Sequence, residues 1–96
     1  MDLTEFKKSL ADKRPPASLS PYLEALWHDA NNDWDKAHTV VQDLEDKTAA
    51  WVHAYLHRKE GDIGNADYWY SRAGRKRPAF TLDQEWDAMV SELLLG

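Results

Sequence analysis

Two histidines spaced four residues apart, His53 and His57, have the spacing in this sequence that best suits metal chemistry. Positions i and i+4 lie on one face of a helix, so both imidazoles could bind one ion. A third ligand would come from His28, His38 or a carboxylate. The segment reads His-Ala-Tyr-Leu-His and lacks the glutamate that follows the first histidine in zinc-protease helices. The alternative hypothesis is therefore a small histidine-based metal-binding protein or metal-dependent hydrolase using His28, His53 and His57.

The same histidines also have a simpler explanation, which rests on an internal repeat. His28 and His57 occupy equivalent repeat positions, and each precedes an aspartate, Asp33 or Asp62, by five residues. A histidine that hydrogen-bonds the following turn would be useful in both copies. This interpretation needs no metal and no other cofactor.

Composition and charge exclude several classes of function. The 96 residues contain no cysteine, which rules out disulfides, thiolate zinc sites and a cysteine nucleophile. There is no nucleophile motif and no glycine-rich phosphate loop, and most carboxylates stand where helix capping explains them. We therefore expect no catalysis. The net charge of −5 disfavours a nucleic-acid partner, and no apolar run is long enough to span a membrane. A cytoplasmic protein is the expectation.

Helical periodicity extends along the whole chain, with start and stop signals between the segments. Ser20-Pro21 and Thr81-x-x-Gln84 are typical N-terminal capping patterns, and Gly61 is typical of a helix end. The sequence predicts an all-α fold of about six helices, solenoid-like, in one domain over residues 1–96. Its expected segments are an N-terminal helix (1–14), a first helical hairpin (20–46), a second helical hairpin (47–78) and a C-terminal capping helix (81–95).

The two expected hairpins carry the repeat, which aligns residues 25–37 with residues 54–66 without a gap. Four pairs are identical at this offset of 29 residues: Ala25/Ala54, His28/His57, Asp33/Asp62 and Ala37/Ala66. The second copy resembles the tetratricopeptide repeat (TPR), because Ala54, Gly61-Asp62, Ala66, Tyr70, Ala73 and Pro78 have its residue types at its spacing. The period of 29 is shorter than the family's, which is about 34. The string from Trp51 to Gly74 also resembles an uncharacterised family of small bacterial TPR-like proteins.

The resemblance implies a function in protein or peptide binding, because the first helix of each TPR pair lines an inner groove. The groove-facing positions carried over onto this chain are Thr48, Trp51, Tyr55, Arg58 and Lys59. Aromatic rings flanked by cations suit an extended peptide or an acidic C-terminus. The alternative is that a terminal helix fills the groove and makes Trp51 and Tyr55 part of the core. A homodimer that covers the apolar ends of the two repeats is a third possibility.

Overall fold

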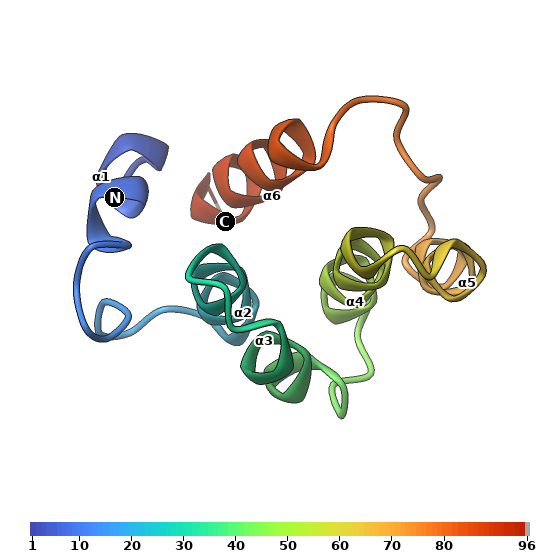
Figure 1. The fold of residues 1–96 in the computed structure, drawn as a ribbon, viewed down its shortest axis with the longest axis horizontal. Coiled ribbons are helices and arrows are strands. Elements are labelled where there is room, and N and C mark those ends of the chain that lie inside the picture. The colour runs from blue at the N-terminus through green and yellow to red at the C-terminus, as the bar shows by residue number, and fades with distance from the viewer. Residues whose placement is uncertain (96) are drawn as a thin grey trace.

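The computed structural model describes residues 1–95, and in that range it contains six α-helices and no strand. The all-helical prediction is therefore confirmed. Figure 1 shows two helical hairpins side by side, formed by α2 with α3 and by α4 with α5, and α6 crossing above α2 and α4. The helices are α1 (Leu3–Ser9), α2 (Pro21–Ala30), α3 (Trp34–Val41), α4 (Lys47–Glu60), α5 (Ile63–Arg72) and α6 (Leu82–Leu95).

The predicted capping signals set where several helices begin. The Ser20 hydroxyl accepts the backbone N–H of Leu23, and Pro21 occupies the first turn of α2. At the start of α6, Thr81 and Gln84 each accept the other's backbone N–H, at 3.1 and 3.0 Å, which is a complete capping box. These bonds satisfy backbone donors that a helix N-terminus otherwise leaves without partners.

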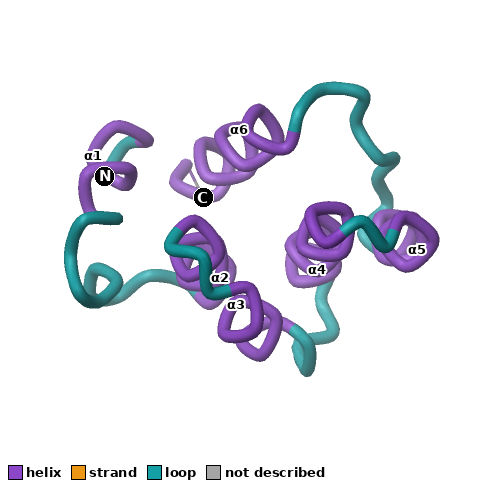
Figure 2. The backbone as a smooth tube through the Cα atoms, viewed as in Figure 1, coloured by secondary structure: helices purple, strands orange, loops and turns teal. Residues whose placement is uncertain are grey.

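The two hairpin turns have the same backbone design, as the repeat predicts. Asn32 and Gly61 both take left-handed conformations, with φ of +64° and +89°. The N–H of Asp33 then bonds the carbonyl of His28, and the N–H of Asp62 bonds that of His57, at 2.9 and 3.0 Å. The histidines therefore contact the turns through their main chains. Figure 2 shows how short the connections are within each hairpin compared with the loop that leads into α6.

Three local expectations differ from the structure. The N-terminal helix predicted for residues 1–14 stops at Ser9, and turns and bends follow it. Helical periodicity would place Leu44 on the apolar stripe of the third helix, but α3 ends at Val41. The same periodicity would turn Ile63 toward the core, but this residue is 38% exposed at the first position of α5.

The core lies where the hairpins meet each other and α6. The four repeat-equivalent alanines, Ala25, Ala37, Ala54 and Ala66, are all fully buried. Side chains this small allow helix axes to approach closely, and close packing gains dispersion energy across the contact.

α6 is fixed over the hairpins by apolar packing and by a buried carboxylate. Trp86 donates its indole N–H to the carbonyl of Leu26 at 3.0 Å. Glu85, only 2% exposed, accepts from Arg58 at 2.7 Å and from the Tyr70 hydroxyl at 2.6 Å. Burial, followed by the hydrogen bond to Glu85, raises the pKa of Tyr70. One carboxylate thus connects α4, α5 and α6.

We predict that Gly61→Ala lowers the free energy of unfolding by about 1 kcal/mol, because an L side chain is strained at the positive φ of Gly61. No atom lies within 4 Å of the added Cβ, so steric overlap contributes nothing. Gly64→Ala is the matched control: it also meets open space but lies inside α5, and should stabilise by about 0.5–1 kcal/mol. Urea unfolding followed by circular dichroism measures both. Equal losses in the two variants would contradict this explanation.

Candidate metal centre

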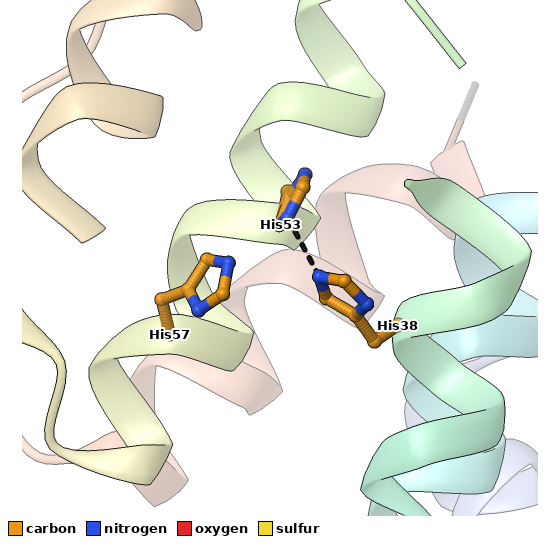
Figure 3. A group of neighbouring side chains, drawn as sticks. All are labelled: His38, His53 and His57. Carbon is orange, nitrogen blue, oxygen red and sulfur yellow. Dashed lines mark hydrogen bonds between the residues drawn. The ribbon is translucent and has the colours of Figure 1, made fainter. Parts of the chain in front are cut away.

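Three histidines from two helices meet at the contact between the hairpins. His38 extends from α3, and His53 and His57 extend from successive turns of α4. One ring nitrogen from each lies within 4.8 Å of the corresponding nitrogen of the other two. Figure 3 shows the three rings turned toward a common point between α3 and α4. His53 and His57 are buried and His38 is half-buried, so the cluster lies just below the surface.

The spacing of the nitrogens is close to what a tetrahedral ion requires. The Nε2 atoms of His38 and His53 are 2.9 Å apart and share one hydrogen bond (Figure 3). A Zn–N bond of about 2.0–2.1 Å places two nitrogens of a tetrahedron about 3.3 Å apart. For this pair, an ion would replace the hydrogen bond after a change of about half an ångström in the N–N distance, within the reach of small χ rotations. The nitrogen of His57 lies within 4.8 Å of the other two.

The carboxylate of Glu60 fixes which nitrogen of His57 can bind a metal. It lies 2.6 Å from His57 Nδ1, so Nδ1 carries the proton and its N–H donates a hydrogen bond to the carboxylate. The lone pair of the neutral ring is then on Nε2. Carboxylate partners of this kind orient metal-binding histidines and raise their basicity.

Aromatic rings enclose the cluster from both sides. Trp34 stacks on His38 with ring centroids 4.8 Å apart and planes inclined by 10°. Trp69 stacks on His53 at 4.0 Å and 19°, and His53 in turn stacks on His57 at 4.7 Å. These contacts restrict ring rotation, so the site is held near one geometry before any ion arrives.

The surroundings keep two of the imidazoles neutral. Burial, with smaller contributions from His38 and His57, lowers the pKa of His53 from 6.5 to about 4. Burial and His57 also lower the pKa of His38, while Glu60 and Asp35 act in the opposite direction. Neutral rings offer lone pairs rather than protons, which is the form that binds transition metals.

A second group of possible ligands, His57 with Glu60 and Asp62, shares His57 with this cluster. Both of its carboxylates are exposed, and the His57 nitrogen that faces Glu60 is the protonated one. It is therefore a weaker metal site than the three imidazoles.

The other histidine proposed from sequence lies elsewhere. His28 packs edge-on against Trp27, and its buried Nε2 has no hydrogen-bond partner in the described part of the chain. The structure brings His53 and His57 together with His38, the other histidine that the sequence offered as a third ligand. The repeat gave no reason to choose His38, because it pairs His57 with His28. The Glu60 partner could have been found from its spacing, since residues i and i+3 are neighbours on a helix.

Three of the residues carried over as groove-facing, Trp51, Tyr55 and Arg58, lie at the contact with α6 and with the loop that precedes it. Trp51 and Tyr55 are 7% and 3% exposed, and the guanidinium of Arg75 covers the Trp51 ring at 3.4 Å. Arg58 bonds Glu85 and the carbonyl of Phe80.

The other two groove-facing residues differ in their contacts. Lys59 pairs with the buried carboxylate of Asp29 at 3.0 Å. Thr48 is half-buried near the start of α4. α6 thus packs over the face of α4 that carries Trp51, Tyr55 and Arg58.

Comparison with protein-family models, with curated proteins and with solved structures finds no match to this chain. No helix within residues 1–95 combines the length and apolar character needed to cross a membrane.

We predict that the metal-free protein loses stability as the pH falls. His53 has a folded-state pKa of about 4, below its ordinary 6.5, so the unfolded chain binds the proton more readily. The stability that neutral His53 contributes is fully present above about pH 6.5 and is lost progressively toward pH 4. Between pH 7 and pH 5 the free energy of unfolding should fall by about 2 kcal/mol from this group. Urea unfolding at a series of pH values in chelator measures it. His53→Gln cannot be protonated in this pH range, so its free energy of unfolding should fall less steeply with decreasing pH. An unchanged pH dependence in this variant would contradict the assignment to His53.

Proposed function

We propose that this protein binds a divalent transition-metal ion through His38, His53 and His57. The observation that carries the proposal is the convergence of three imidazole nitrogens within 4.8 Å, from two helices, in a partly buried position. Imidazole suits zinc, copper, nickel and iron, whereas calcium and magnesium prefer oxygen ligands. Zinc, with no geometric preference of its own, fits a tetrahedral arrangement of this kind.

The ion would also have a structural effect, because its ligands come from both hairpins. His38 belongs to the α2–α3 hairpin, and His53 and His57 belong to the α4–α5 hairpin. A metal bound here therefore stabilises the folded chain by the free energy of binding, since the unfolded chain presents no such site.

We predict that untagged protein binds about one Zn²⁺ per chain and melts at a higher temperature when zinc is present. At free zinc about 100-fold above Kd, linkage adds about 2.7 kcal/mol of stability. In a domain of this size that corresponds to a rise in Tm of roughly 10 °C or more. Titration calorimetry and thermal melts in zinc and in chelator measure both quantities.

The control for this experiment is the histidine outside the cluster. His38→Ala should abolish the zinc-dependent rise in Tm, whereas His28→Ala should retain it. Glu60→Gln should weaken zinc affinity by about 10- to 100-fold, because it removes the carboxylate that orients His57. Equal zinc affinity in wild type and His38→Ala would overturn the proposal.

A second candidate function is partner binding at the inner face of the helical array. The observation that favours it is a cavity of about 500 Å³ between α1, α2, α4 and α6. Tyr55 and Lys59, two of the residues expected from the sequence to face a partner, line this cavity. At its base both donate to Asp29, a carboxylate only 1% exposed. Lysines, carboxylates and the ring of Trp86 on its walls suit a polar peptide segment.

For this test, a peptide that binds the protein is selected from a random library. We predict that it loses affinity for the double variant Lys7→Glu/Asp83→Lys. These two charges lie at the cavity, and reversing both alters the local potential while leaving the net charge unchanged. The matched control is Lys36→Glu/Asp43→Lys, which reverses two exposed charges in and just after α3. Calorimetric titration of the peptide into each variant measures the effect. Equal affinity in both double variants would exclude this cavity as the peptide site.

A further inference from the structure

The three-histidine cluster provides fewer ligands than a tetrahedral ion accepts. Among residues 1–95, no carboxylate oxygen and no fourth imidazole joins His38, His53 and His57 within the same distance. Three neutral imidazoles also contribute no charge to the coordination sphere, and the Glu60 carboxylate acts on the ion only through His57. Structural zinc sites fill all four positions with protein atoms, whereas three protein ligands leave one position for water or another exchangeable ligand.

Asn65, near the start of α5, is a polar side chain in contact with one of the three imidazoles. Its Nδ2 lies 3.4 Å from His57 Nε2, the nitrogen whose lone pair is available. This distance is close to the separation of two ligand atoms around a tetrahedral zinc, about 3.3 Å. Asn65, on α5, therefore lies beside the His57 nitrogen that would bind the metal.

The orientation of the Asn65 amide follows from its other neighbour. The same Nδ2 lies 3.4 Å from a carboxylate oxygen of Asp62, and a carboxylate only accepts hydrogen bonds. The group facing the site is consequently the NH₂ and not the amide oxygen. An NH₂ cannot bind a metal, so Asn65 does not complete the coordination. When an ion takes the His57 lone pair, the Asn65 N–H loses its acceptor and becomes free to donate to whatever occupies the fourth position.

We propose that the bound ion keeps one exchangeable coordination position, which takes water or a small monodentate anion, and that the Asn65 amide donates a hydrogen bond to that ligand. The inference rests on the proposed metal binding. Negative charge is favoured at this position because the three ligands are neutral, and Glu60, hydrogen-bonded to His57, offsets only part of the charge of a divalent ion. The Asn65 donor adds a hydrogen bond to the anion, and the partial burial of the cluster strengthens both interactions.

The test replaces zinc by Co²⁺, whose visible spectrum reports the number and type of its ligands. Co²⁺-loaded wild type is titrated with sodium azide, with sodium perchlorate at equal ionic strength as the control for salt. We expect a saturable spectral change with azide and none with perchlorate. Asn65→Ala should bind Co²⁺ with unchanged affinity and bind azide several-fold more weakly. Asn31→Ala, in the turn after α2, is the control and should behave as wild type.

A second variant tests the position of Asn65 independently. Asn65→Asp places a carboxylate oxygen where the NH₂ stands, so it should become the fourth ligand. The expected results are tighter Co²⁺ binding and loss of the azide response.

The outcomes separate this inference from the proposed function. If Co²⁺ binds but azide leaves its spectrum unchanged, the fourth position is closed and the inference is wrong, while metal binding stands. If azide binds equally to wild type and Asn65→Ala, the role given to Asn65 is wrong. If Co²⁺ does not bind at all, the proposed function fails and the inference fails with it.

Discussion

The contact between α3 and α4 is aligned by the hydrogen bond from the Trp34 indole to the carbonyl of Leu56, at 2.8 Å. It joins the first residue of α3 to the middle of α4, so it fixes both the separation and the register of these helices. His38 is one turn beyond Trp34 and stacks on its ring, and His57 immediately follows Leu56. A change in register of one residue would turn His38 by about 100° away from the α4 histidines.

The inner face of the array is stabilised by two buried carboxylates, each with a tyrosine and a cation. Asp29 accepts from Tyr55 and Lys59, and Glu85 accepts from Tyr70 and Arg58. A buried charge is tolerated only when its hydrogen bonds are satisfied, and removing one partner costs far more than the pair contributes. The contacts of Asp29 join α2 to α4, and those of Glu85 specify where α6 docks. Tyr55, Arg58 and Lys59, which the sequence suggested for peptide binding, thus also stabilise the fold.

The histidine cluster places three polar rings where apolar side chains would pack at lower cost. Burial lowers the pKa of His53 and of His38 because it disfavours the charged imidazolium. Both rings are therefore neutral in the metal-free protein. Stacking on Trp34 and Trp69 compensates part of the lost hydration. Glu60 fixes the third ring, His57, through its Nδ1. The same contacts that make the cluster tolerable in the fold also orient its nitrogens, which couples the stability of the hairpin contact to the chemistry proposed for it.

Local signals in the sequence determined most of the helix plan. Capping at Ser20 and at Thr81 with Gln84, and the left-handed turns at Asn32 and Gly61, act within a few residues, so spacing alone reveals them. The i, i+4 spacing likewise placed His53 and His57 on one face of α4.

The choice of His38 rather than His28 as their neighbour was decided by the tertiary structure, because it depends on the packing of α3 against α4. Whether the face with Trp51 and Tyr55 is open or covered depends in the same way on the docking of α6. Both are contacts between distant segments, and the periodicity of a single helix holds no information about which other helix will lie against it.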